Sequence, residues 1–341
     1  MNIAIIDSPL QALNSIEYLS SCNLNNKQCC FIIFSNVAVS NSNLEQIEFV
    51  LELFGYSNRL ILNVNGGFKG LIKSREKIKF LARKLSKDQV QKCLLGEYRS
   101  LAAKALVNEI KPEQLIVVDD GNATLRINRV SSPITISGIL KKLLARIFNL
   151  KITPWEKITF FSVYGISKQI SLNDQLVFND YSFLKTRMSE YSNSEKEFII
   201  GSPLQAAGVV EDDLALTLIL IGNILSNKKT SKSELIYISH RRESKSKLAE
   251  IAKYGIKVVS LAYPFELYAL MNKENAVKIN GFYSSLFPNL LNLNNEISIT
   301  AYSIASSIIQ PQFQEFVSNV YNSYQCMSDP RLQLKSLIHN E

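Results

Sequence analysis

The chain is poor in the residues that metal sites and disulfide frameworks need. It has two histidines and five cysteines in 341 residues, and no two cysteines form a CxxC pair. This scarcity gives no zinc-site pattern, and the odd number of cysteines favours reduced thiols. The N-terminus lacks the basic region of a signal peptide, and its first apolar run stops at Asp7. We therefore expect a cytoplasmic protein.

Long hydrophobic runs are also missing. The longest, Leu214 to Leu225, is too short to cross a bilayer and predicts a buried helix. The net charge of +8 suits an anionic ligand or an anionic membrane surface. Two basic amphipathic segments, Ile72–Leu85 and Ile139–Phe148, predict either helices that rest on the inner face of the cell membrane or ordinary surface helices. No basic-aromatic stripe, finger or helix-turn-helix signature occurs, so nucleic acid is not an expected partner.

Short apolar segments alternate with helical stretches, and this pattern predicts an α/β fold with parallel sheets covered on both faces. In the first half we expect strands at Asn2–Ile6, Gln28–Phe34, Arg59–Val64, Cys93–Leu95, Gln114–Val118 and Trp155–Val163. The helices expected between and after them are Pro9–Ser20, Leu44–Phe54, Ile72–Leu85, Ser100–Ile110 and Ile139–Phe148. Because 341 residues exceed what one hydrophobic core usually serves, two domains are expected.

A polar stretch with little periodicity, residues 166–196, predicts the crossover between a domain of residues 1–165 and a domain of residues 197–341. The second half repeats the alternation, with strands expected at Glu197–Ile200, Glu234–Ser239, Lys257–Leu261, Ala276–Ile279 and, as the last strand, Ile297–Thr300. Its expected helices are Leu214–Leu225, Lys245–Lys253, Glu266–Met271, Gln312–Tyr324 and a short tail from Arg331.

Both halves open with the same five residues after the first strand. Ser-Pro-Leu-Gln-Ala occurs at Ser8–Ala12 and again at Ser202–Ala206. A serine followed by proline is typical of a helix start, with serine as the N-cap and proline at the first helical position. The echo therefore predicts two halves of similar architecture, each with a helix directly after its first strand.

The Asp119-Asp120-Gly121 motif follows an expected strand in the first half. Ligands of open α/β sheets bind at the carboxyl ends of the strands, so a carboxylate here is placed to act as a general base. The alternative is a turn in which an aspartate caps the next helix and Gly121 supplies a positive φ.

Three motifs of the second half also follow expected strands. His240 could donate to a phosphate with Arg241 and Arg242 nearby, or belong to a capping segment with solvated charges. Glu266, in Pro264-Phe265-Glu266, could bind ribose hydroxyls or serve as an acidic residue of a first helical turn. Ser284-Ser285 could form an anion site, or Ser284 could cap a helix.

In this order, the motifs resemble those of the bacterial sialyltransferases of the GT-B type, above all the lipooligosaccharide sialyltransferase and polysialyltransferase branches. Those families carry a D/E-D/E-G motif, an HP motif, a P-x-E and a Ser-Ser pair, and their chains show a similar Ser-Pro-Leu-Gln opening. The matching residues here are Asp119-Asp120-Gly121, His240, Pro264 to Glu266, and Ser284-Ser285. The match covers both halves through short motifs, and Arg241 departs from it where the family has proline.

The resemblance implies a GT-B fold, in which two Rossmann-like domains face each other across a cleft. It implies an inverting, metal-independent transfer, without cofactor, of sialic acid or a related nonulosonic acid from its CMP form. The acceptor would be a hydroxyl of a cell-surface glycan, possible examples being lipid-linked lipooligosaccharide and capsule. One of Asp119 and Asp120 would be the base and His240 the partner of the CMP phosphate. The residues implied to bind the donor are Gly121, Ser202, Pro264, Glu266, Ser284 and Ser285.

Three other functions remain open from the sequence. A GT-B glycosyltransferase could use a UDP- or GDP-sugar, and a GT-B epimerase could turn over a nucleotide sugar without an acceptor. A degenerate relative could bind CMP without catalysis, because Arg241 replaces the proline of the HP motif.

Overall fold

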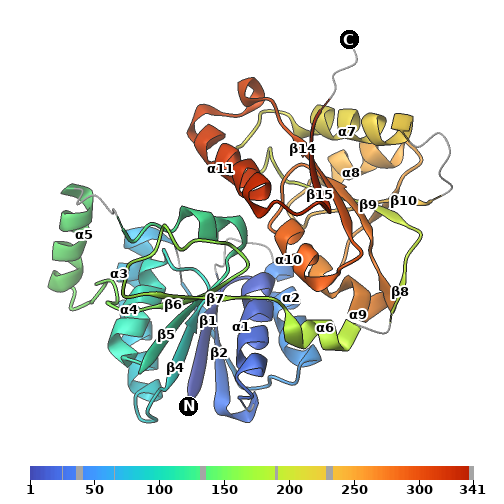
Figure 1. Ribbon diagram of the computed structural model, residues 1–341. Coiled ribbons are helices and arrows are strands. Elements are labelled where there is room, and N and C mark those ends of the chain that lie inside the picture. The colour runs from blue at the N-terminus through green and yellow to red at the C-terminus, as the bar shows by residue number, and fades with distance from the viewer. Residues whose placement is uncertain are drawn as a thin grey trace. The chain divides into compact units, whose positions relative to one another are not determined.

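A computed structural model describes residues 1–24, 26–35, 41–64, 66–130, 136–188, 191–227 and 233–337. Contacts divide the chain into two compact units, Met1–Phe183 and Leu184–Glu341, each with its own sheet (Figure 1). The boundary falls within the stretch 166–196, of which residues 189 and 190 lie outside the described part.

The first unit is built on a seven-stranded sheet in the order β3-β2-β1-β4-β5-β6-β7. Every neighbouring pair of strands runs parallel. The strands are β1 (Asn2–Ile6), β2 (Cys29–Ser35), β3 (Arg59–Asn63), β4 (Lys92–Leu95), β5 (Gln114–Val118), β6 (Thr159–Ser162) and β7 (Gln175–Phe178). The central strands are buried along nearly their whole length, which is why they read as continuous apolar runs.

Helices cover both faces of this sheet. Helix α1 (Pro9–Ser21) packs beside α2 (Asn41–Leu53), and α3 (Gly67–Leu85) packs beside α4 (Leu101–Ile110) on the opposite face (Figure 1). The unit also contains α5 (Ile136–Ile147) and the 3₁₀ segments η1 (Asn26–Gln28) and η2 (Gly121–Arg126). The predicted start of α1 is confirmed, because the Ser8 hydroxyl accepts the Gln11 amide at 3.3 Å and proline occupies the first turn.

The second unit is built on a six-stranded parallel sheet in the order β11-β10-β9-β13-β14-β15. Its strands are β9 (Glu197–Ile200), β10 (Leu235–Ile238), β11 (Lys257–Val259), β13 (Lys278–Gly281), β14 (Ser298–Ser303) and β15 (Leu332–Ser336). Its helical segments are α6 (Ser182–Met188), which spans the unit boundary, α7 (Asp213–Asn227), α8 (Lys245–Ala252), η3 (Phe265–Leu267), α9 (Tyr268–Asn272), α10 (Leu286–Leu293), η4 (Ser306–Ile308) and α11 (Pro311–Met327). A small separate ladder pairs β8 (Ser192–Asn193) with β12 (Glu274–Asn275).

Two predictions for regular structure are wrong. The tail from Arg331 forms the edge strand β15 beside β14, so Ile297–Thr300 is not the last strand. Ser202-Pro203 does not start a helix: the chain makes turns up to Gly208, which has a φ of 72°, and α7 begins only at Asp213.

The predicted crossover contains more regular structure than the sequence indicated. Within it, β7 pairs with β6, and α6 follows. A buried ion pair holds the segment before β7 on the first unit, since Arg129 Nε lies 2.6 Å from Asp174 Oδ2. Arg129 also donates to the Trp155 carbonyl at 2.8 Å, so its guanidinium is satisfied within the core.

Among the residues so described, no helix combines the length and apolar character that crossing a membrane requires. Helix α7, where the sequence predicted a buried helix, contributes Leu216, Leu220, Ile221 and Ile224 to the core.

Candidate functional site

The connectivity of the first sheet creates a switch point between β1 and β4. From β1 the chain proceeds to β2 and β3 on one side, and it then crosses to β4 and β5 on the other. The carboxyl edge at such a point is where open α/β sheets bind ligands. Four acidic residues come shortly after neighbouring strands at this edge: Asp7 after β1, Glu97 after β4, and Asp119 and Asp120 after β5.

The two aspartates of the Asp119-Asp120-Gly121 motif have different environments. Asp119 is only 1% exposed, and its Oδ2 accepts the Val163 amide at 2.7 Å. Burial raises the pKa of Asp119 to about 6, against hydrogen bonds from Ser162 and Val163 that lower it. Asp119 therefore ties the end of β5 to the segment after β6.

Asp120 has no such backbone partner for its carboxylate. Its Oδ1 accepts Gln11 Nε2 at 2.7 Å, and its side chain does not cap η2. Gly121 takes a φ of 58°, so the turn predicted as the alternative is present, but its cap is not the Asp120 carboxylate. Asp120 is half-buried, whereas Asp119 is buried, so Asp120 is the more accessible member of the pair.

Gln11 fixes the orientation of the Asp120 carboxylate. It is completely buried, its Oε1 accepts the Asp7 amide at 2.7 Å, and its Nε2 donates to Asp120. The adjoining backbone is Gly96, at which a Cβ would lie 2.1 Å from Gln11 Oε1. The bridge from β1 to β5 therefore requires glycine at the end of β4.

The carboxyl groups of Asp7, Glu97 and Asp120 lie close enough to change one another's pKa. Burial raises the pKa of Asp120 well above its usual range, and the nearby Asp7 and Glu97 raise it further. Burial and then Glu97 raise the pKa of Asp7 to about 6. Burial also acts to raise the pKa of Glu97, but Arg99, with Nη2 3.0 Å from Glu97 Oε2, holds it below its ordinary value. Such a cluster keeps one carboxylate ionised and makes its neighbours stronger bases.

Changing Gly96 to alanine is expected to expel the Gln11 amide from its place and to leave Asp120 without its donor. The expected cost is about 1.5–3 kcal/mol of folding free energy, the usual range for losing a hydrogen bond to a charged group. Urea unfolding of the variant measures it. Gly165→Ala is the matched control, because nothing lies within 4 Å of its Cβ position. Equal midpoints for the two variants would contradict this role of Gly96.

In the second unit, His240 follows β10 and presents one defined tautomer. Its Nδ1 accepts the Arg242 amide at 3.1 Å, which leaves Nε2 as the protonated nitrogen of the neutral ring. Burial, and after it the charges of Arg241, Arg242 and Lys247, lower the pKa of His240 to about 4. At neutral pH the side chain is therefore an uncharged hydrogen-bond donor.

A buried ion-pair network supports the His240 loop. Glu243 is 2.7 Å from Lys247 Nζ, and the same Nζ is 3.1 Å from Asp213 and 3.2 Å from the Ser202 carbonyl. The other Glu243 oxygen accepts the His240 amide at 2.8 Å. A Cβ on Gly201 would lie 2.2 Å from Glu243, so glycine at the end of β9 leaves room for this carboxylate.

Glu266 lies in η3, after β11, and is 7% exposed. Burial raises its pKa, whereas the Asn289 amide, which donates to Oε1 at 2.9 Å, and the charge of Arg241 lower it. Pro264 precedes η3, and its carbonyl accepts the Leu267 amide at 2.9 Å. The hydrogen bond from Asn289 to Glu266 joins η3 to α10, so Glu266 has a packing role besides that of an acidic residue in a first helical turn.

The Ser284 hydroxyl binds the start of a helix, close to its alternative interpretation, but the N-cap residue of this helix is Ser285. The hydroxyl of Ser284 accepts the Leu286 amide at 3.2 Å at the start of α10, and the Ser284 amide donates to the Tyr324 hydroxyl at 2.9 Å. Ser285 makes no side-chain cap to this helix. Ser202, after β9, and Ser284, after β13, flank the point where the strand order of the second sheet reverses. The predicted donor-binding residues of the second half thus follow β9, β10, β11 and β13 at one sheet edge.

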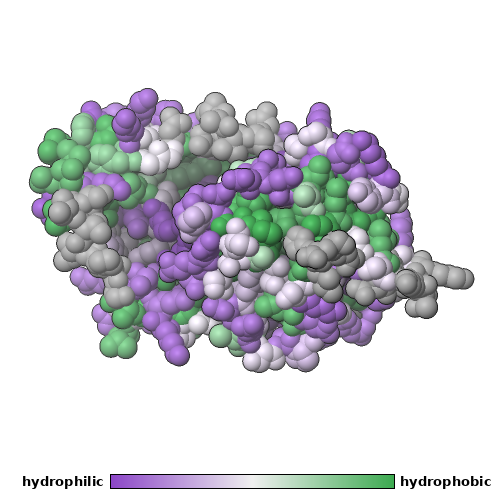
Figure 2. All heavy atoms as spheres, turned by 90° about the horizontal axis from the view of Figure 1, so that it is seen from above, coloured by the Kyte–Doolittle hydropathy of each residue, from purple (hydrophilic) through white to green (hydrophobic). Residues whose placement is uncertain are grey.

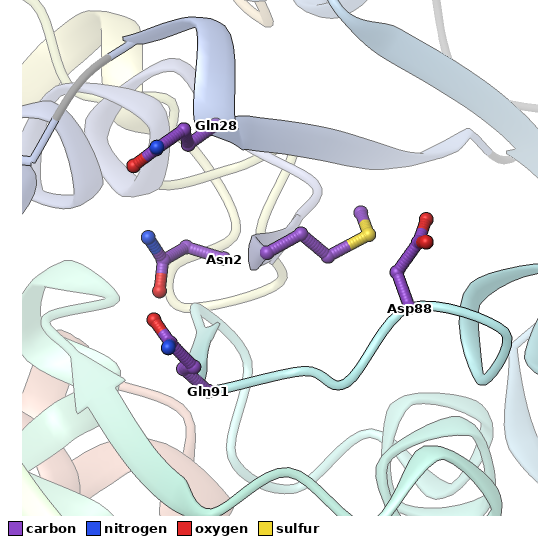
Figure 3. Close-up of a pocket in the computed structure, with 5 residues that line it drawn as sticks. Asn2, Gln28, Asp88 and Gln91 are labelled. Atoms are coloured by element: carbon purple, nitrogen blue, oxygen red, sulfur yellow. The ribbon is translucent and has the colours of Figure 1, made fainter.

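The opposite edge of the first sheet has a cavity of about 360 Å³ at the amino ends of β1, β2 and β4. Figure 3 shows Asn2, Gln28, Asp88 and Gln91 around it. It lies away from the carboxyl edge at which such sheets bind ligands, and we assign it no function. In the described ranges, no group of three or more His, Cys, Asp and Glu residues is arranged to hold a metal ion.

The sequence interpretation missed Asp7, Glu97 and Gln11. The signal for the first two was available, because both follow an expected strand within two residues, as Asp120 does. Gln11 was noticed only as part of the repeated Ser-Pro-Leu-Gln-Ala segment.

No protein-family model matches the sequence, and no curated protein matches it. Solved structures do match the fold. An α/β-galactoside α-2,3-sialyltransferase from Photobacterium phosphoreum is 13% identical with a TM-score of 0.51, and the match covers 98% of both chains. A putative UDP-N-acetylglucosamine 2-epimerase from Listeria monocytogenes is 12% identical with a TM-score of 0.54, over 88% of this chain and 78% of its own.

A UDP-GlcNAc 2-epimerase from Methanocaldococcus jannaschii, in complex with UDP-GlcNAc and UDP, is 14% identical with a TM-score of 0.51 over 97% of this chain and 94% of its own. These similarities extend over both units, each of which has a parallel sheet with a switch point. The chain has the GT-B fold, made of two Rossmann-like units.

Proposed function

We propose that the chain is a glycosyltransferase that moves sialic acid, or a related nonulosonic acid, from its CMP-activated form to a hydroxyl of a cell-surface glycan such as lipooligosaccharide or capsule. The observation that carries the proposal is that the two aspartates of the Asp-Asp-Gly motif have different environments. Asp119 binds the backbone of Val163, while Asp120, after β5, accepts a hydrogen bond from Gln11 and has a raised pKa. The similarity to a sialyltransferase of the same fold supports the donor class.

In the proposed reaction, Asp120 is the general base. Its carboxylate takes the proton of the acceptor hydroxyl while the acceptor oxygen forms a bond to the anomeric carbon. The bond from that carbon to the phosphate oxygen breaks, CMP leaves with the electron pair, and the configuration inverts. Asp120 then returns the proton to solvent. Its raised pKa makes it a stronger base than an ordinary aspartate.

The leaving phosphate is proposed to bind the second unit. His240 would donate from Nε2, as a neutral ring, to a phosphate oxygen on which negative charge develops. The hydroxyls of Ser284 and Ser285 would add donors, and Glu266 would accept from the ribose. Gly121, Ser202 and Pro264 would shape the donor site. The reaction as proposed needs no metal ion or cofactor.

A second candidate is a reaction on a UDP-sugar, because UDP-GlcNAc 2-epimerases share the fold. An epimerase would convert its nucleotide sugar without an acceptor, while a transferase would release the nucleotide only when an acceptor is present. A relative that only binds CMP would release nothing.

The decisive experiment measures CMP release from CMP-sialic acid with lactose or a sialylated oligosaccharide, in EDTA. Titrations with CMP, UMP and GDP run beside it. Acceptor-dependent release together with CMP binding supports the proposal. Binding of UMP or GDP in place of CMP would exclude the donor assignment.

The pH dependence of transfer tests the carboxyl cluster. Because Asp120 must be ionised to act as base, the rate is expected to fall as pH falls through its raised pKa, well above the usual range of an aspartate. Glu97 raises this pKa, so Glu97→Gln is expected to move the acidic limb of the profile to lower pH. Glu113→Gln, a change in an exposed glutamate of the same unit, should leave the limb in place. If the acidic limb of the pH profile stays in place in Glu97→Gln, this cluster does not determine the pKa of the general base.

A further inference from the structure

Four large hydrophobic residues of helix α5 are exposed, whereas an ordinary surface helix buries its hydrophobic face. Ile139, Leu140, Leu143 and Ile147 are 55%, 53%, 54% and 66% exposed, whereas Ala145 is completely buried. At about 100° per residue, the four exposed side chains fall within an arc of about 100°, and Ala145 lies almost opposite the centre of that arc. The helix therefore buries the small residue Ala145 and presents these four large apolar residues outward.

The surrounding charge is positive. The described side chains of α5 include the cationic Lys141 and Arg146 and no acidic residue. Helix α3 is adjacent, because the Arg75 guanidinium lies 5.7 Å from the centre of the Phe148 ring just after α5. The α3 sequence has a single acidic residue, Glu76, and its cationic residues are Lys69, Lys73, Arg75, Lys77, Lys79, Arg83 and Lys84.

An apolar helical face next to basic residues matches the chemistry of one kind of surface, an anionic lipid bilayer. Two copies of this chain are a poorer fit, because pairing through α5 would bring the basic α3 and α5 helices of both copies together. Figure 2 shows hydrophobic atoms gathered at the left margin of the molecule, the side on which Figure 1 draws α5.

We propose that the face formed by Ile139, Leu140, Leu143 and Ile147 inserts into the interfacial layer of a bilayer rich in anionic phospholipid, with the basic residues of α5 and α3 on the headgroups. The inference does not depend on the transfer reaction. The exposed apolar arc would insert into the bilayer, and the basic residues would give the selectivity for anionic lipid.

Vesicle sedimentation tests the proposal with the purified full chain. Vesicles of phosphatidylcholine alone are compared with vesicles in which part of it is replaced by phosphatidylglycerol. Wild-type protein is expected to sediment with the anionic vesicles and much less with the neutral ones. Each of Leu140→Glu and Leu143→Glu is expected to lower the partition coefficient about tenfold or more, because one apolar side chain no longer transfers from water.

The matched control is Leu172→Glu, since Leu172 is an exposed leucine of the first unit that lies outside α5. It should bind like wild type, and all three variants should keep the wild-type circular dichroism and melting temperature. The reverse variant Leu143→Trp should show a blue-shifted emission, quenched by brominated lipid, above the background of Trp155.

Three results would overturn the proposal. One is equal binding to neutral and anionic vesicles, and another is unchanged binding of Leu143→Glu. The third is a wild-type dimer that Leu143→Glu converts to a monomer without any vesicle binding, which would make a second copy the occupant of this face. None of these measurements involves turnover, so they stand apart from success or failure of the CMP-release assay.

Discussion

Replacing Asp120 with asparagine is expected to slow acceptor-dependent CMP release by about 10²–10⁴-fold, the usual contribution of a general base. Asparagine has the same shape, and its carbonyl oxygen can still accept Gln11 Nε2, which now donates to Asp120 at 2.7 Å. It cannot take the acceptor proton. Binding of CMP to the second unit and the melting temperature should therefore remain those of the wild type.

Asp119→Ala is the companion change, and its effect is expected on stability instead. The Val163 amide, buried and 2.7 Å from Asp119 Oδ2, would lose its acceptor. An unsatisfied buried amide costs about 1–3 kcal/mol, so the melting temperature should fall by several degrees. At a temperature where the variant is folded, its rate should remain far above that of Asp120→Asn. The opposite pattern, an inactive Asp119→Ala and an active Asp120→Asn, would reverse the two roles.

Among the strands that the sequence predicted well are those buried on both faces. Residues 2–6 and 114–118 form β1 and β5 as expected, because a central parallel strand is a continuous apolar run. Edge strands do not have this signature. In β15 the sequence Leu-Gln-Leu-Lys-Ser leaves most side chains exposed, and the strand owes its pairing to β14, far away in the chain. Nothing local distinguishes such a segment from a polar tail.

The repeated Ser-Pro-Leu-Gln-Ala segment shows why a short motif underdetermines structure. After Ala12 the chain continues with helix-compatible residues, among them Asn14, which donates to the Asp119 carbonyl at 3.1 Å. After Ala206 the chain meets Gly208 with a φ of 72°, followed by two valines, and the turn ends. The same five residues thus begin a helix in one unit and an irregular turn in the other.

The sequence predicted where the candidate site residues lie relative to the strands, but it did not predict which residues they contact. Asp120 and His240 were singled out because each follows an expected strand, and the structure keeps both at strand ends. Which aspartate has a structural role depends on Val163, which lies in the segment directly after another strand, β6. The hydrogen bond from Gln11 to Asp120 joins residues 109 positions apart, and the pattern of the sequence does not predict a contact at that separation.

Lys247→Met is expected to destabilise the protein by about 3–5 kcal/mol, the largest stability effect predicted for a single residue here. The Lys247 side chain is 5% exposed and lies between two carboxylates, Asp213 at 3.1 Å and Glu243 at 2.7 Å. Methionine fills much the same volume but removes the charge, so two buried carboxylates would be left without their cation. Urea unfolding at neutral pH measures the loss.

Lys253→Met is the matched control, because Lys253 pairs with Glu250 at 2.6 Å while 68% of its side chain is exposed. Exposed pairs contribute about 0–1 kcal/mol, so this variant should unfold near the wild-type midpoint. Adding Glu243→Gln to Lys247→Met removes one of the stranded charges, and the double variant should be more stable than the sum of the single losses predicts. Additive losses would show that Lys247 and Glu243 do not act as a buried pair. Coupling would mean that the network holding the His240 amide, and with it the proposed phosphate donor, depends on Lys247.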